Sequence, residues 1–159
     1  MSVNDTKDVL DILRPFDEQT TELFLWLRKY AWSICPRANE LVYDNYNAVA
    51  IGWSPSTKLG HTICSIAIMR ANQNIHWGFY HGSKLEDPLH LLLGKGSQYR
   101  YILVKDKKTF PRTYIKQLVQ QAYVNSLGLV KDERDITSGQ TIIKSISAKK
   151  RPGKKVNTI

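Results

Sequence analysis

Two groups of side chains in this sequence have the types and spacing that binding chemistry needs. The first group combines phenol rings, an imidazole and a guanidinium, and it comprises Tyr43, Asn45, Tyr46, His76, Tyr80 and Arg100. His76 and Tyr80 alternate with apolar residues along one predicted strand, so they share a face. We expect Arg100, on the next strand, to point the same way and to offer its planar donor fork to a small anion.

These residues also have a purely structural interpretation, which the sequence leaves open. In that interpretation His76 caps the edge of a strand, and Arg100 pairs with Asp87 or Glu86. The nearby segment 94–97, Gly-Lys-Gly-Ser, lacks the spacing of a phosphate-binding P-loop, because Leu89 stands where its first glycine belongs. Its glycines are expected to allow a helix to stop and the chain to re-enter a strand sharply.

The second group is a basic C-terminal tail. Its clustered cations are Lys149, Lys150, Arg151, Lys154 and Lys155. Residues 131–159 carry eight basic and three acidic side chains, which is +5 of the net charge of +9. Such a cluster neutralises phosphates and predicts weak, salt-sensitive binding of nucleic acid. The tail lacks the interleaved aromatic rings of single-strand binders, so a solvated tail that only aids solubility stays an alternative of equal weight.

Residues for catalysis or metal binding are not apparent. No serine stands in a nucleophile elbow, and Cys35 and Cys64 belong to no CxxC pair. His61 and Cys64 are three apart beside a strand, which places them on opposite faces. We therefore expect no catalytic residue, no metal site and no cofactor, and lean against an enzyme without excluding one. Both thiols are expected to be buried and reduced, as in a cytosolic protein.

The elements that must position these residues follow from periodicity and turn signals. Helices are expected at 5–13, at 17–34 with Asp17 as N-cap, in a turn from Pro36 to about Tyr43, and at 87–93. Strands are expected at 47–53, 62–70, 74–80 and 98–104. A last helix begins near 109–111 and ends near Gly128, and its buried stripe comprises Ile115, Leu118, Val119 and Ala122.

This order predicts an α+β fold, an antiparallel sheet of about four to five strands with the N-terminal and C-terminal helices on one face. The chain has 159 residues, which suits one domain at 16–127, flanked by an N-terminal extension at 1–15 and the basic tail at 128–159. No signal peptide and no apolar run of membrane-spanning length are apparent. We expect a cytoplasmic protein that is a monomer or dimer and does not enter a membrane.

The sequence resembles the YdhG-like family of small domains of unknown function. The carrying residues are the run 41–48 (Leu-Val-Tyr-Asp-Asn-Tyr-Asn-Ala), the run 65–67, the run 76–79 (His-Trp-Gly-Phe), Gly82, the run 85–88, Leu91, Leu92, the run 94–96 and Arg100. The resemblance extends from about Phe16 to Tyr123. It implies a helix-flanked antiparallel sheet and a bacterial-type cytosolic protein, and it implies no established activity.

Some relatives in that family are described as frataxin-like iron chaperones. Iron in such a protein needs clustered carboxylates, because it prefers hard oxygen ligands. Here acidic residues cluster only near the N-terminus, at Asp5, Asp8, Asp11, Asp17, Glu18 and Glu22. The leading prediction is instead a binding module that recognises a small ligand or a protein partner through the aromatic, His76 and Arg100 face. Nucleic-acid binding by the tail and an iron role are the alternatives.

Overall fold

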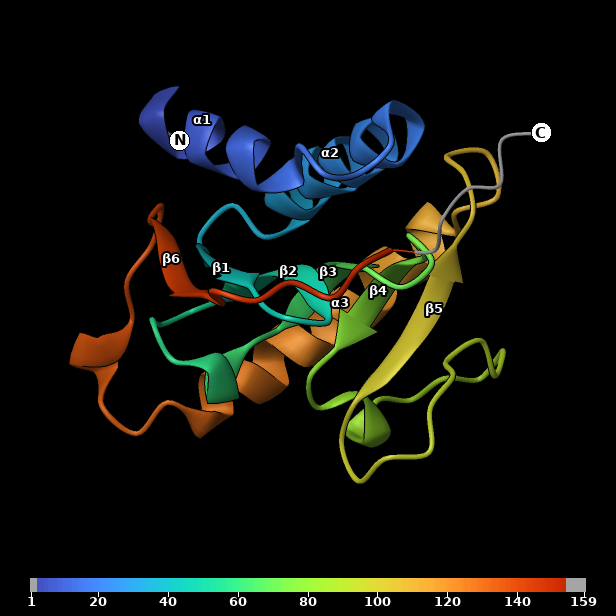
Figure 1. Ribbon diagram of the computed structural model, residues 1–159. Coiled ribbons are helices and arrows are strands. Elements are labelled where there is room, and N and C mark those ends of the chain that lie inside the picture. The colour runs from blue at the N-terminus through green and yellow to red at the C-terminus, as the bar shows by residue number, and fades with distance from the viewer. Residues whose placement is uncertain (1–2, 154–159) are drawn as a thin grey trace.

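A mixed sheet of six strands forms the centre of the computed structural model, which describes residues 3–153 (Figure 1). The strands are β1 (Asn39–Asp44), β2 (Ala48–Ser54), β3 (Cys64–Met69), β4 (Ile75–Phe79), β5 (Arg100–Val104) and β6 (Thr141–Ile146), in the spatial order β5-β4-β3-β2-β1-β6. The first five strands are antiparallel to their neighbours, whereas β6 is parallel to β1. The predicted α+β class is confirmed, but the sheet has six strands and is not wholly antiparallel.

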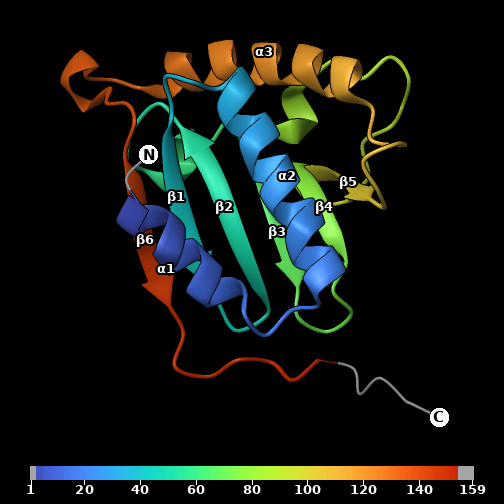
Figure 2. The same cartoon turned by 90° about the horizontal axis from the view of Figure 1, so that it is seen from above.

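The helices cover one face and one end of this sheet. α1 (Val3–Leu13) and α2 (Glu18–Ile34) lie over the same face, whereas α3 (Arg112–Leu129) runs across one end of the strands (Figure 2). The predicted stripe of α3 is buried as expected, and Ser126 on the same helix donates a hydrogen bond of 3.4 Å to the carbonyl of Thr62. In the part of the chain that the structure describes, no α-helix lies over the opposite face of the sheet (Figure 1).

The main core lies between α2 and the sheet. Phe24, Leu27 and Ala31 follow helical spacing on α2 and are fully buried against alternate strand residues such as Ile66 and Trp77. Asp17 stands at the start of α2 as predicted, although its side chain makes no capping hydrogen bond. Its backbone N–H instead donates to the amide oxygen of Gln73 at 2.9 Å, which ties the start of α2 to the β3–β4 turn.

A buried ion pair joins α2 to β1. Arg28 donates from Nε and Nη2 to the two carboxylate oxygens of Glu40 at 2.6 and 2.7 Å, and both side chains are almost fully buried. Trp32 and Thr141 also donate to this carboxylate, at 3.1 and 2.9 Å. Every oxygen of the buried acid is therefore paired, which is what makes such a charge tolerable inside a protein.

Two predicted helices are wrong. Residues 39–44 are extended as β1, because Val42 packs in the core opposite Ile51 in the sheet register. Residues 87–93 form an irregular segment instead of a helix. Its backbone N–H groups at Leu91 and Leu92 donate to the side chain of Asp87 at 3.1 and 2.9 Å, an arrangement in which a carboxylate replaces helical carbonyls as the acceptor.

Part of the predicted tail belongs to the sheet. Residues 141–146 form β6, and the chain after β6 runs along the end of the sheet opposite α3 (Figure 2). The backbone N–H of Arg151 donates to the carbonyl of Tyr46 at 2.9 Å, and the ammonium of Lys150 lies 2.6 Å from a carboxylate oxygen of Asp44. Residues 141–151 are thus fixed to β1 and to the turn that follows it.

Candidate functional site: the uncovered face of the sheet

The face of the sheet away from α1 and α2 carries an unusual set of rings. Tyr43, Ala50, Ala67, His76 and Leu103 are consecutive cross-strand partners from β1 to β5 and therefore share this face. Three strand spacings separate Tyr43 from His76, about 14 Å. Between them the strands carry only small side chains, so rings can lie across the sheet there.

Three rings form a column on the β4–β5 side of this face. His76 stacks on Tyr101 with a centroid separation of 4.3 Å and an interplanar angle of 5°, and Tyr101 stacks on Tyr99 at 5.8 Å and 19°. Parallel rings of this kind attract each other and hold one another in place. We call the set Tyr43, His76, Tyr80, Tyr99 and Tyr101 the aromatic face.

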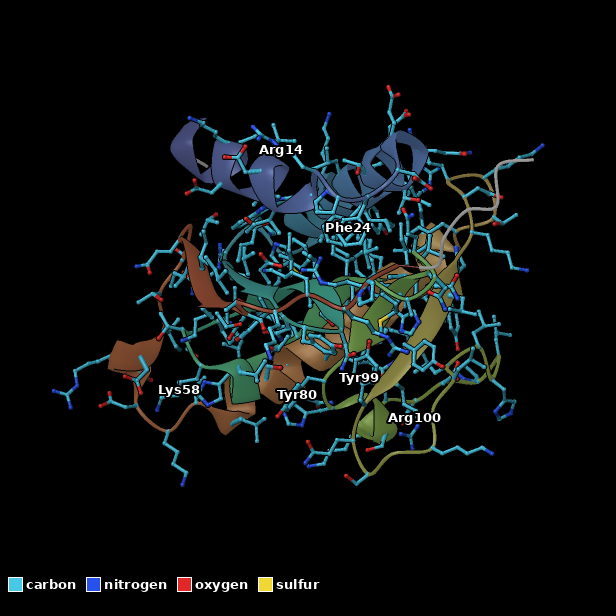
Figure 3. The ribbon with its side chains drawn as sticks, in the orientation of Figure 1. Arg14, Phe24, Lys58, Tyr80, Tyr99 and Arg100 are labelled. Atoms are coloured by element: carbon cyan, nitrogen blue, oxygen red, sulfur yellow. The ribbon has the colours of Figure 1, made fainter. Side chains whose placement is uncertain are left out.

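Gly78 makes room for the end of the column. A Cβ atom added at Gly78 would lie 2.2 Å from the hydroxyl of Tyr99, so only glycine lets this ring lie over β4. Figure 3 shows Tyr80 and Tyr99 on the side of the sheet away from Phe24, which packs under α2. Burial raises the pKa of Tyr99 to about 12, although a hydrogen bond with Ser65 opposes the shift.

Tyr43 and Tyr80 supply the opposite side of the aromatic face. Burial raises the pKa of Tyr43, and the nearby hydroxyl of Tyr80 raises it further. The hydroxyl of Tyr43 is buried and has no hydrogen-bond partner among the described residues. A buried hydroxyl without a partner costs free energy, so an incoming acceptor or donor there would be favoured.

His76 is half-buried and titrates below its ordinary range. Burial lowers the pKa of its imidazole, because the charged form loses solvation. Its cross-strand partners are Ala67 and Leu103, and Tyr101 covers one side of its ring. No carboxylate faces it from these elements, so the ring is neutral and available for stacking at neutral pH.

The structure separates the six residues that the sequence grouped together. Tyr43, His76 and Tyr80 meet on the aromatic face. The expectation that Arg100 shares this face is corrected, because Arg100 pairs with Phe79 in the register and His76 pairs with Leu103. Adjacent strand positions point to opposite faces.

Arg100 also lacks the carboxylate partner of the structural alternative. Its guanidinium donates to the carbonyls of Gly96 and Tyr99 at 2.7 and 2.8 Å. Asp87 is instead held by the hydroxyl of Tyr114 and by backbone amides. Gly94 has a φ of +124°, which fits its expected role in letting the chain re-enter β5.

Asn45 and Tyr46 lie in the turn between β1 and β2, at the end of the sheet. The amide oxygen of Asn45 accepts a hydrogen bond of 2.7 Å from Ser145, and Tyr46 is 46% exposed. Sequence reasoning missed Tyr99 and Tyr101. Their i, i+2 spacing on a predicted strand was a usable signal, but only the β4–β5 register shows that this face is the one that His76 occupies.

The basic tail does not reach the aromatic face through its described part. Lys150 is paired with Asp44, and Arg151 is tied to the β1–β2 turn, with a side-chain contact of 3.5 Å to Asn47. Lys149 is exposed beside them. Lys154 and Lys155 lie outside the described residues. The described cations of the tail and the aromatic face therefore belong to two separate surfaces.

Other chemistry has little support in the described part of the chain. Cys35 and Cys64 are buried free thiols, and burial and a hydrogen bond with Cys35 raise the pKa of Cys64 well above its usual range. A thiol of this kind is a poor nucleophile. Within the residues described, no three His, Cys, Asp or Glu side chains gather closely enough to hold a metal ion.

No protein-family model, curated protein or solved structure matches this chain. Among the helices of residues 3–153, none combines the length and apolar character needed to cross a membrane. The candidate site consequently has to be interpreted from its own geometry.

Proposed function

We propose that the chain is a binding protein that takes a planar, aromatic ligand on the aromatic face. One observation carries the proposal. The stacked column of His76, Tyr101 and Tyr99 stands across a floor of small residues from Tyr43, whose buried hydroxyl lacks a partner among residues 3–153. Planar rings bind to such a surface by stacking, and the Tyr43 hydroxyl supplies a directional hydrogen bond.

The chemistry of the face favours a neutral ring over an anion. Burial lowers the pKa of His76 and raises the pKa of Tyr43 and Tyr99, so these three rings are uncharged at neutral pH. Arg100, which would have attracted an anion, points to the other face and is engaged by two carbonyls. This revises the predicted ligand while keeping the predicted role as a binding module.

A panel of probes measured by isothermal titration calorimetry tests the proposal. Riboflavin and adenosine 5′-monophosphate represent planar ligands, and cyclohexanecarboxylate and glucose 6-phosphate represent ligands without an aromatic ring. Tyr101→Leu removes the central ring of the column, and Tyr46→Leu is the matched control at the end of the sheet.

We expect at least one planar probe to bind, and we expect Tyr101→Leu to weaken it about tenfold or more, which corresponds to 1.4 kcal/mol. Tyr46→Leu should leave the affinity unchanged. Absence of binding by both planar probes, or equal losses in the two variants, would contradict the proposal.

Membership of the YdhG-like family is proposed as well. It is supported by the positions that its carrying residues occupy. The run 76–79 lies in β4, and the run 41–48 extends from β1 through the following turn to the first residue of β2. Gly82 packs closely on Arg100, because a Cβ atom added at Gly82 would lie 2.9 Å from the backbone nitrogen of Arg100. That family suggests a cytosolic location. Cell fractionation followed by detection of this protein in the cytosolic fraction tests the location directly.

A further inference from the structure

The outer side of β5 is an open edge of the sheet. Tyr101 exchanges two backbone hydrogen bonds with Leu93, of 2.7 and 3.0 Å, on the side away from β4. Peptide groups alternate in direction along an antiparallel strand, so the N–H and C=O of Leu103 also point away from β4. Within the described chain, Leu93 alone pairs with this side of β5, which leaves the position at Leu103 unpaired.

Apolar side chains are exposed both at this open position and on the segment that pairs with β5. Leu103 is 44% exposed, and the irregular segment beside β5 exposes Leu89, Leu91 and Leu93 by 62, 37 and 45%. A surface of this kind is unusual on a protein without a partner. Exposed edges with apolar flanks are also templates for pairing with another extended chain.

A groove of about 830 Å³ begins at the same position. It runs between the start of α2, the β3–β4 turn and the segment after β5, and its apolar lining comprises Leu23, Ile75, Leu103 and Val104. The side chains of an added strand alternate between its two faces. One set would enter this groove, and the other set would lie beside Leu103 on the side of the aromatic face. The edge and the groove together have the shape that strand addition requires.

Charge identifies the kind of chain that fits. Lys105, Lys107 and Lys108 follow β5 at one end, and Lys95 and Arg100 stand at the other. Against these five cations the groove offers Glu22, which lies 3.5 Å from Lys107, and Asp106, which accepts hydrogen bonds from Thr109. The Lys105 end therefore has three cations against two acids. At the other end Lys95 and Arg100 stand against Glu86 and Asp87 of the irregular segment, and the Asp87 carboxylate is already engaged by the hydroxyl of Tyr114 and two backbone N–H groups.

We propose that this edge binds an extended segment of a partner protein with apolar residues in its centre and acidic residues at both ends. The segment adds to β5 as an antiparallel strand next to Leu103. A second copy of this chain is a poorer occupant, because its own β5 and the residues after it carry four cations, Arg100, Lys105, Lys107 and Lys108, against one acid, Asp106. The inference is independent of the proposed ligand on the aromatic face.

A synthetic probe tests the inference. The peptide Glu-Asp-Val-Thr-Val-Thr-Val-Asp-Glu, labelled with a fluorophore, is titrated with the full-length protein and followed by fluorescence anisotropy. One control peptide carries proline in place of both threonines and cannot pair as a strand, and a second carries lysine in place of its four acids. We expect saturable binding of the first peptide only.

Protein variants separate the two contributions. Lys105→Glu, Lys107→Glu and Lys108→Glu combined should weaken binding at least about tenfold, whereas the same charge change at Lys7, Lys29 and Lys116, which lie on helix surfaces, should have little effect. Leu103→Pro removes the outward N–H, and Leu103→Val keeps it, so only the proline variant should lose the peptide. Circular dichroism establishes that each variant is folded.

Amide hydrogen exchange supplies a readout that does not depend on any variant. Binding of the peptide should slow exchange at the N–H of Leu103, which faces away from β4. Equal binding of all three peptides, unchanged exchange at Leu103, or preference for an oligonucleotide over the acidic peptide would overturn the inference. Dimerisation of the protein that is abolished by Leu103→Pro would equally overturn it in favour of a second copy.

Discussion

The two faces of this sheet differ in how their side chains are buried. The face under α1 and α2 is closed: Phe24, Leu27 and Trp77 are fully buried, and the ion pair of Arg28 and Glu40 has its hydrogen bonds satisfied. The aromatic face is half-open, and it covers small residues with stacked rings. Two α-helices thus close one side, whereas the other side carries stacked rings and, among the described residues, no α-helix.

Among the described residues, buried polar atoms without a partner occur on both faces, and the exposure of the side chains that carry them distinguishes them. In that part of the chain the indole N–H groups of Trp53 and Trp77 lack partners, but both side chains are fully buried under α2, where a ligand does not reach. Tyr43 is only partly buried and belongs to the surface without a helix. The comparison assigns the tryptophans to packing and supports the proposal that Tyr43 contacts a ligand.

The largest effect is expected at the buried ion pair of the closed face. Glu40→Ala leaves the Arg28 guanidinium buried without its carboxylate, so the free energy of unfolding should fall by about 3–5 kcal/mol. Arg28→Met combined with Glu40→Leu should recover most of this loss, because no charge is left buried. Urea denaturation followed by circular dichroism measures both. A loss below about 1 kcal/mol in Glu40→Ala, as for an exposed pair, would show that this face is not closed.

Matched ring deletions compare the two faces directly. Phe24→Ala removes a fully buried ring and should cost about 3–5 kcal/mol. Tyr101→Ala removes a partly exposed ring and should cost only about 1–2 kcal/mol, within the ordinary range for a substitution. The free energies of unfolding come from the same denaturation experiment. Equal costs would mean that the aromatic face is a second core.

Gly78→Ala should displace the ring of Tyr99 from the aromatic face. The added methyl group occupies the position of the Tyr99 hydroxyl, so the ring must leave β4, at an expected cost of about 1–2 kcal/mol. Once the ring is solvated, the pKa of Tyr99 should fall from about 12 towards its ordinary value of 10.0. Ultraviolet titration of tyrosine ionisation measures the shift, with Tyr99→Phe identifying the signal. A pKa that stays near 12 would contradict this packing.

The smallest effect is expected from the protonation of His76. Its pKa is lowered in the folded state, so the unfolded state binds the proton more readily below about pH 6.5, its ordinary value. Stability from this group is fully present above that pH and is lost as the pH falls through the folded pKa. His76→Gln should remove this part of the pH dependence, because glutamine does not titrate. Identical stability profiles of the two proteins between about pH 5 and 8 would contradict it.

Much of the fold follows from local pattern. The i, i+3/i+4 spacing of Leu27 and Ala31 on α2, and the stripe of Ile115 and Leu118 on α3, predicted helices that the structure confirms. The alternation around Ile51 likewise predicted β2. These signals are local because each element buries one face of its own.

The remaining elements depend on contacts distant in sequence. β6 pairs with β1 about a hundred residues away, and the local sequence of Thr141–Ile146 does not identify that partner. The run 39–44 contains Glu40 and Asp44, and these carboxylates are buried only because Arg28, Arg70 and Lys150 reach them. Contacts with side chains from other elements decide whether such a run forms a buried strand, and the hydrophobic periodicity of the run itself does not reveal those contacts.

For the candidate site, as for the fold, local pattern predicted the features within one strand but not those that depend on the pairing of strands. The shared face of His76 and Tyr80 follows from alternation within one strand. The place of Arg100 and the contribution of Tyr99 and Tyr101 depend on the register between β4 and β5, which alternation within one strand does not reveal.

The central claim, that the aromatic face binds a planar ring, is tested most directly by nuclear magnetic resonance of the aromatic side chains during titration with riboflavin. Stacking predicts upfield ring-current shifts at His76, Tyr99 and Tyr101, a change at Tyr43, and no change at Phe24 or Trp53 on the closed face. Shifts confined to residues outside the aromatic face, or no shift in any ring at saturating concentrations of riboflavin and adenosine 5′-monophosphate, would contradict the claim.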